Sequence, residues 1–200
     1  MRGLAILVSR VGEAEGSRPL AAALACAGSE HDRAALLVEL SEGRAPRPAL
    51  VASAAARALE ERLAAHLPEA SVASRGSFCH LALPAGEEGL ERAPAALALV
   101  RDSIGVVHLP PDLLQAALLP CGLEPSAALL RADLGRDRAL AALAVRDLTG
   151  RGLAVVVAKK PLDWVPSRRA LFGALPRGAA GGLPPRLLRR LGAGGPLVAT

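Results

Sequence analysis

The feature that most constrains the fold of this chain is a series of short, almost continuously apolar runs. Each run has the length of a β-strand, and it lacks the polar alternation of a strand with one face in water, so both of its faces should be covered by helices. The runs are Leu4–Ser9, Ala34–Leu40, Phe78–Leu83, Ile104–Leu109, Ala127–Arg131 and Leu153–Ala158. They predict an α/β fold with a mostly parallel central sheet between two helical layers.

Helical patterns separate the apolar runs. They span Pro19–Ala27, Val51–Leu67, Glu88–Asp102, Pro111–Leu119 and Arg136–Gly150, and a last pair spans Ser167–Leu175 and Pro185–Leu191. Ser53 is placed to cap the second helix. In the fifth helix, Leu140, Leu143, Val145 and Leu148 predict one apolar face for the core. Right-handed crossovers place the loops after the strands along one edge, where open α/β sheets bind ligands.

The composition excludes several classes of protein. The chain has 200 residues, a length typical of one domain, and 52% of them are hydrophobic. Its net charge of +5 comes from arginines that are spread along the sequence and not interleaved with aromatic residues, so we do not expect nucleic-acid binding. No run approaches the length of a membrane span and no signal peptide is apparent, which predicts a cytoplasmic protein.

The cysteines and histidines give no sign of a metal site. Cys26, Cys79 and Cys121 lie far apart in or beside apolar stretches, so we expect buried free thiols. The histidines outside the loops discussed below also lack the spacing of metal ligands; they are His31, His66 and His80.

The first strand leads into a glycine-bearing turn and an alanine-rich helix, "SRVGEAEGSRPLAAALA". This is the frame of a phosphate-binding loop, which needs backbone N–H groups around the phosphates, a lysine for their charge and a hydroxyl for Mg²⁺. Gly12 and Gly16 fit the frame, but Ser17 stands at the lysine position and Arg18 at the hydroxyl position. Glu13 and Glu15 also occupy positions where they should repel a polyphosphate. Taken alone, the stretch is better explained as an ordinary strand-to-helix turn.

Two further strand ends belong to the same edge of the predicted sheet. In "VVHLPPDLL" the strand ends at His108, where an acidic residue would hold Mg²⁺ through water; neutral imidazole is a poor Mg²⁺ ligand. A hydrogen-bonded strand-end histidine is the simpler interpretation of His108. In "ALLVELSEG" a strand ends in Glu39 and Ser41, where the corresponding nucleotide-site pattern has two aspartates that flank one apolar residue. Glu39 keeps an acid at the first of these positions, and Ser41 does not at the second.

Together these segments resemble the MinD/ParA family of deviant Walker ATPases, in the SIMIBI class of P-loop NTPases, including its TadZ/CpaE-like members of pilus assembly. The resemblance extends over residues 1–176 and includes "CHLALPAGEEGLE" and "SAALLRADLGRDRALAALAVRDLTGRGLAVVVAKKP". In the second segment, Ala158 replaces the base-binding asparagine of the family, and Lys159 remains. The resemblance implies a P-loop NTPase-like three-layer sandwich, followed by a Gly/Pro/Arg-rich tail over residues 177–200.

The replacements fall on the ligand positions, and the scaffold is retained. The resemblance therefore implies a non-hydrolysing pseudo-ATPase that needs no cofactor and acts by binding protein partners, as an interaction, localisation or regulatory factor in pilus assembly or secretion. Its vestigial phosphate loop would comprise Gly12, Gly16, Ser17, Arg18, Glu39, His108 and Lys159.

The alternative is an active but atypical ATPase, with ATP and Mg²⁺ as cofactors. In this hypothesis Arg18 binds the anion at the start of the first helix and His108 acts as general base. Further candidates near strand ends are Glu39, Asp112, Asp133 and Lys159.

Partner contacts beyond the sheet are also expected from the sequence. The family implies a homodimer, which here would not depend on nucleotide. The basic, partly amphipathic segment Arg186–Leu191 is a candidate contact with the inner face of the membrane, against the simpler interpretation of a solvated tail. Trp164 is expected in a lid over the sheet edge, with a partner anchor as the alternative.

Overall fold

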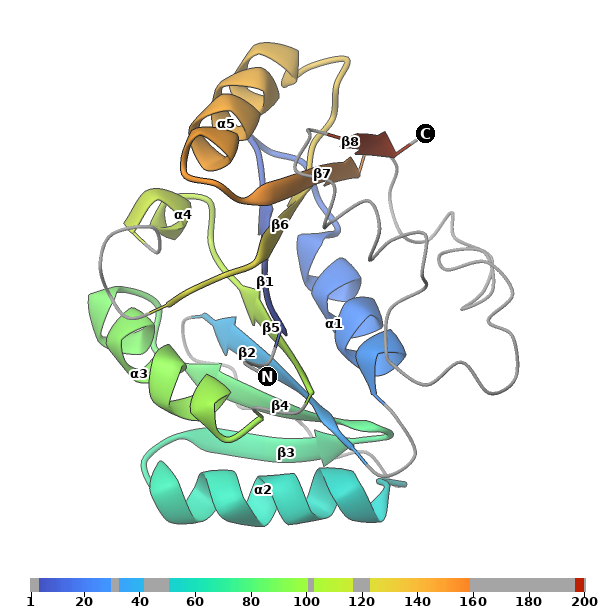
Figure 1. Cartoon of the computed structure of the whole chain (residues 1–200), viewed down its shortest axis with the longest axis vertical. Coiled ribbons are helices and arrows are strands. Elements are labelled where there is room, and N and C mark those ends of the chain that lie inside the picture. The colour runs from blue at the N-terminus through green and yellow to red at the C-terminus, as the bar shows by residue number, and fades with distance from the viewer. Residues whose placement is uncertain are drawn as a thin grey trace.

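A computed structural model of the chain describes residues 4–29, 33–41, 51–100, 103–116, 123–158 and 197–199. They form an eight-stranded sheet with the order β3-β4-β2-β5-β1-β6-β7-β8 (Figure 1). Every neighbouring pair is parallel except β3 and β4, which are antiparallel. The strands are β1 (Leu4–Arg10), β2 (Ala35–Leu40), β3 (Ser71–Arg75), β4 (Phe78–Leu83), β5 (Ile104–His108), β6 (Ala127–Arg131), β7 (Ala154–Ala158) and β8 (Leu197–Ala199). The predicted mostly parallel α/β fold is confirmed.

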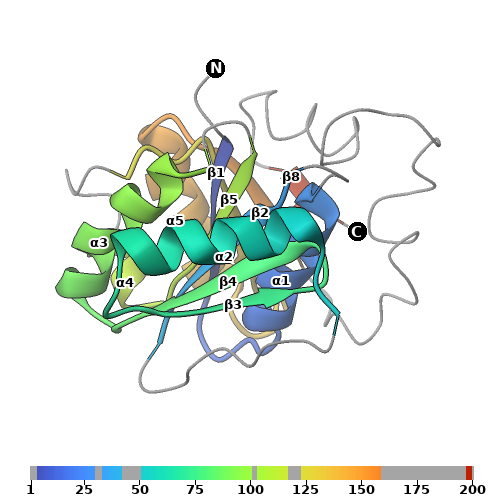
Figure 2. The same ribbon diagram turned by 90° about the horizontal axis from the view of Figure 1, so that it is seen from below.

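Helices cover both faces of the sheet, which gives three layers. The helices are α1 (Ser17–Gly28), α2 (Ala54–His66), α3 (Glu87–Ala98), α4 (Leu113–Ala116) and α5 (Arg138–Gly150). Ser53 caps α2 as predicted, because its hydroxyl accepts a hydrogen bond from the Ala56 N–H at 3.1 Å. In Figure 1, α1 lies on one side of the sheet, and α3, α4 and α5 lie on the other. Figure 2 shows α2 running along the β3–β4 hairpin.

The two faces have separate apolar cores. On the α1 face, Leu20 and Leu24 pack with alternate residues of the strands such as Ile6, Val8 and Val106. On the opposite face, helix residues such as Leu59, Leu90 and Leu148 pack with the intervening strand residues. Because side chains of a strand alternate between faces, the continuous apolar runs provide one set of residues for each core.

The predicted strands are all present, and two additional strands were missed. β3 has a half-exposed, mixed sequence, because it lies at the edge of the sheet. It forms a hairpin with β4 through Gly76 and Ser77, and Gly76 has a φ of 59°, which favours glycine. β8 comes from the predicted tail and pairs with β7.

The prediction of one apolar core face on α5 was wrong in part. Leu148 is 1% exposed, whereas Leu140 and Leu143 are each 53% exposed. The reason is helical geometry: Ala141 and Leu148 face the sheet, and Leu140 and Leu143 lie about a quarter-turn or more away from that line.

Of the predicted thiols, Cys79 is buried, and burial together with the charge of Glu60 raises its pKa to about 12. Cys26 is only half-buried, because it lies at the edge of the α1 core near Ser77.

Several predictions lie outside the described residues. They concern the final helix pair, Trp164, Lys159, Cys121, His31 and the segment Arg186–Leu191. Within the described ranges, no helix is both long and apolar enough to cross a membrane.

Candidate functional site

The loop from β1 to α1 lies at the carboxyl edge of the sheet, between the ends of β5 and β6. The Val11 N–H donates to the Arg131 carbonyl at 2.8 Å, which attaches the start of the loop to β6. Gly12 and Gly16 have φ of 61° and 94°, values that side chains disfavour. A Cβ on Gly12 would also clash with the carboxylate of Asp137. Both glycines are therefore required by the path of this loop.

The two acids of the loop point outward. Glu13 has 85% of its side chain exposed and forms an ion pair with Arg136 at 3.2 Å, and Glu15 is exposed as well. The side chain between them, Ala14, is buried. Glu13 and Glu15 thus lie in solvent on either side of the buried Ala14, and the repulsion of a polyphosphate by their carboxylates stays a prediction.

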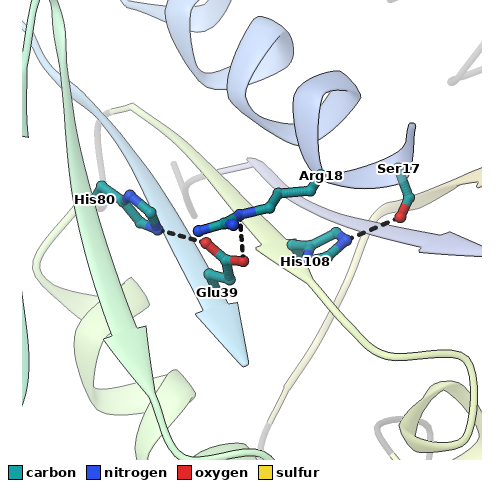
Figure 3. A network of polar contacts seen from close by, with 5 residues as sticks. All are labelled: Ser17, Arg18, Glu39, His80 and His108. Atoms are coloured by element: carbon teal, nitrogen blue, oxygen red, sulfur yellow. Dashed lines mark hydrogen bonds and ion pairs between the residues drawn. The ribbon is translucent and has the colours of Figure 1, made fainter. Parts of the chain in front are cut away.

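Arg18, Glu39 and His80 form a chain of polar contacts beside the loop, in which Glu39 and His80 are buried and Arg18 is partly exposed (Figure 3). Arg18, in the first turn of α1, donates through Nε to Glu39 Oε1 at 2.6 Å. His80 Nε2 lies 2.8 Å from the other carboxylate oxygen of Glu39. Leu37, two residues before Glu39 on β2, pairs in register with His80 on β4. Since Leu37 belongs to the apolar core on the α1 face, Glu39 and His80 face α1 as well.

The electrostatics of Glu39 follow from these two partners. Only 3% of Glu39 is exposed, and burial by itself would raise the pKa of the carboxyl group. The hydrogen bond from His80 and the guanidinium of Arg18 outweigh that effect, so the pKa of Glu39 lies below its ordinary value of 4.5. Glu39 is consequently a carboxylate at neutral pH, with both oxygens occupied.

Ser17 and His108 form a third contact in the same cluster. Ser17 begins α1, and its Oγ lies 3.0 Å from Nε2 of His108 at the end of β5 (Figure 3). Burial lowers the pKa of His108 from 6.5 despite the nearby Glu39 carboxylate, and the charges of Arg18 and Arg10 lower it further. His108 is therefore neutral at pH 7, and its Nδ1 is buried without a hydrogen-bond partner.

A further basic side chain, that of Arg131, lies beneath the loop. It is the last residue of β6 and 5% exposed, and its Nη1 donates to the carbonyls of Ala132 and Ala158 at 2.6 and 3.2 Å. Its Nε is buried without a partner and lies 3.9 Å from where a Cβ of Gly16 would be. The guanidinium thus fills space directly under the N-cap of α1.

The structure brings together most of the predicted site. Gly16, Ser17, Arg18, Glu39 and His108 converge at the start of α1, and Gly12 begins the same loop. Ser41 directly follows β2 beyond Glu39, and its Oγ is buried without a partner.

Two residues of the alternative enzyme hypothesis are exposed, and among the residues that the structure describes no hydrogen bond or ion pair joins them to the cluster. Asp133 is exposed and accepts a hydrogen bond from the Gly135 N–H at 3.0 Å, which closes a turn. Asp112 is exposed in the turn before α4. The described ranges contain no group of three or more histidine, cysteine and acidic side chains that is able to hold a metal ion.

His80 and Arg131 belong to the site but were not among its predicted residues. The signal for each was a polar residue in or at the end of an apolar strand, "FCHLAL" and "AALLR". A buried histidine or arginine needs partners, so such a residue points to polar groups on adjacent strands.

The chain matches no protein-family model, no curated protein and no solved structure.

Proposed function

We propose that this chain is a non-hydrolysing domain of the MinD/ParA type, which retains the scaffold of a phosphate loop and acts by binding protein partners. The observation that carries the proposal is that polar groups around the loop are bonded to one another. Arg18 is held by Glu39, and Ser17 by His108. A phosphate loop that binds nucleotide needs its cation and its hydroxyl available for the ligand.

The Ser17 contact favours descent from a working loop. In P-loop NTPases a loop hydroxyl and an acid at a nearby strand end share the Mg²⁺ ion. Here the Ser17 hydroxyl and His108 are in direct contact at 3.0 Å, and the partner at the strand end is a neutral imidazole. In this interpretation Ser17 takes the hydroxyl position of the phosphate loop. Arg18 then lies outside the loop motif and forms the ion pair with Glu39.

Arg131 fits the same interpretation. If Ser17 is the hydroxyl residue, Gly16 stands at the position of the lysine, and the guanidinium of Arg131 lies directly beneath it. Its Nη1 is bonded to two carbonyl groups, so this cation is anchored in the sheet and not mobile on a loop. A positive charge is thereby retained at the loop without the reach of a lysine.

The energetics disfavour the alternative of an active enzyme with Arg18 as the anion-binding group. If Arg18 turned its Nε away from Glu39 to bind a phosphate, Glu39, which is almost fully buried, would have His80 alone as a partner. Leaving a buried acceptor short of a partner costs about 1–3 kcal/mol. No further charged residue of the described ranges replaces Arg18 at Glu39.

Isothermal titration of the full chain with MgATP and MgADP tests the proposal. We expect no binding at physiological nucleotide concentrations, because both the cation and the hydroxyl are already bonded within the protein. A dissociation constant in the micromolar range would overturn it. Turnover of ATP that Arg18→Ala and His108→Ala both abolish would establish the enzyme in its place.

The placement in pilus assembly or secretion rests on the resemblance to TadZ/CpaE-like members. Deletion of the gene in its own host, followed by counting surface pili by electron microscopy, tests it. We expect pili to be lost and to return with the wild-type gene; normal piliation in the deletion strain would remove this part of the proposal.

A further inference from the structure

On the face of the sheet opposite α1, a trough runs between α5, α4 and the end of β1. It has a volume of about 650 Å³. Its apolar surface includes Leu114 of α4, which is 5% exposed, and Leu140 and Leu143 of α5, which are each 53% exposed. Figure 1 shows α4 and α5 on the same side of the sheet, and α1, whose first turn carries Ser17 and Arg18, on the other side.

The two leucines make the trough an open surface. They are two of the three most exposed large hydrophobic residues among those described, and they lie one turn apart on one side of α5. The sheet-facing side of the same helix is already filled by Ala141 and Leu148. A half-exposed apolar side of a helix beside a hydrophobic trough is a usual receptor for another helix.

The charges at the trough are almost all positive. Arg10, Arg146 and Arg151 line it, and Asp147 is the one acid among the described lining residues. Asp147 is already paired with Arg151 at 3.5 Å, whereas Arg10 and Arg146 form no ion pair within the described part of the chain. The trough therefore offers apolar area flanked by unneutralised cations.

From this we infer that the trough is the docking site of an acidic amphipathic helix from a protein partner, with leucine-type residues against Leu140 and Leu143 and carboxylates against Arg10 and Arg146. The inference rests on the proposed function, since it identifies the surface through which a domain that binds protein partners would do so. Charge complementarity selects the occupant. A second copy on a two-fold axis would place the arginines of both troughs against each other, which is repulsive.

The probe for the experiment is a synthetic helical peptide about as long as α5, with 13 residues in that helix. It carries leucines along one side, glutamates beside them, a helix N-cap and a fluorophore. Two control peptides have glutamate replaced by lysine, or the same composition in a scrambled order. Fluorescence anisotropy against the full chain measures the affinity at low and at physiological salt.

We expect the acidic peptide to bind, more weakly at higher salt, and the two control peptides to bind at least about tenfold more weakly. Leu143→Asp should reduce the affinity about tenfold or more, because it places a carboxylate in the apolar contact. Arg146→Glu should reduce it by about three- to tenfold. Neither position is buried, so both variants should fold like the wild type, which circular dichroism checks.

The matched controls lie far from the trough. Val51→Asp introduces the same charge at an apolar side chain that is 76% exposed, and Arg62→Glu reverses an exposed charge on α2. Both should bind the acidic peptide like the wild type.

Several outcomes would overturn the inference. They are no binding of the acidic peptide at millimolar concentration, equal binding of the lysine peptide, or equal losses in the Val51 and Arg62 controls. Self-association of the chain that Leu143→Asp abolishes would assign the trough to a second copy. Binding to anionic lipid vesicles that the same variant abolishes, without peptide binding, would assign it to a membrane surface. The nucleotide titration is independent of these results, so the trough can fail while the pseudo-ATPase proposal stands.

Discussion

The two sides of the carboxyl edge of the sheet differ in whether their charged side chains have ion-pair partners. On the α1 side, the carboxylate of Glu39 is buried and bonded to Arg18 and His80. On the α5 side, Arg10 and Arg146 stand beside half-exposed leucines without an ion-pair partner in the described part of the chain. On the first side the polar groups are bonded to one another, whereas on the second side apolar and cationic side chains are exposed, which is why we propose the second side as the docking surface. If the chain is of the MinD/ParA type, as we propose, the position of the ligand site in that family would not show where this chain binds its partner.

The largest expected effect on stability comes from substitutions of the leucines of α5, which show whether each leucine belongs to the core or to the trough. Leu148→Ala removes a core side chain that is 1% exposed, and it should lower the free energy of unfolding by about 2–5 kcal/mol. Leu143→Ala, on the same helix and 53% exposed, should change it by no more than about 0.5 kcal/mol. Urea denaturation measures both. Equal losses would mean that Leu143 is a core residue and that the trough is not a free surface.

A smaller effect is expected at the polar cluster. Glu39→Gln keeps the shape of the side chain and removes its charge, so Arg18 and His80 lose a charge-assisted partner. The free energy of unfolding at pH 7 should fall by about 1–3 kcal/mol, a range reduced for the partial exposure of Arg18. The matched control is Glu61→Gln, an exposed residue of α2, which should stay within about 0.5 kcal/mol of wild type.

The pH dependence checks the cause of that loss. The folded-state pKa of Glu39 lies below 4.5, so its contribution is present above that pH and disappears as the pH falls through the folded-state value. The difference between wild type and Glu39→Gln should therefore vanish in acid. A difference that persists there would show that packing, and not charge, accounts for it.

The scaffold was predictable from the sequence because hydrophobic burial acts through local patterns. Apolar runs such as Leu4–Ser9 and Ile104–Leu109 are long enough for a strand and too uniform for an exposed one. β3 was not predictable in the same way, because an edge strand such as "SVASR" is only partly buried, and its signal was the Gly-Ser turn.

The polar cluster was predictable only in part. Loop residues such as Arg18 and His108 were recognisable from motif order, but their partners depend on strand register. The contact between His80 and Glu39 requires knowledge that β4 pairs with β2 with Leu37 opposite His80. The outward direction of Glu13 and the exposure of Leu143 depend on the path of a loop and the rotation of a helix, which residue types alone do not determine.

The smallest expected effect is the contribution of His108 to the pH dependence of stability. Its size distinguishes a buried structural histidine from a general base. Its folded-state pKa is lower than 6.5, so the unfolded chain binds the proton more readily. Stability should consequently rise with pH from the folded-state value up to about 6.5 and be fully present above it. Glu39, Arg18, Arg10 and His80 all act on this group, and of these Glu39 alone favours the charged form.

Urea denaturation from pH 5 to pH 8, for wild type and His108→Asn, measures this contribution. Asparagine keeps a polar group near Ser17 and does not titrate, so the variant should lose the part of the slope that His108 causes and retain the rest. Since Glu39 titrates below this range, its contribution stays constant across the comparison. Identical slopes in the two proteins would show that His108 does not titrate differently on folding. The closed cluster on the α1 side would then hold an imidazole that is free to exchange protons, as a general base requires, and the contrast with the open trough would weaken.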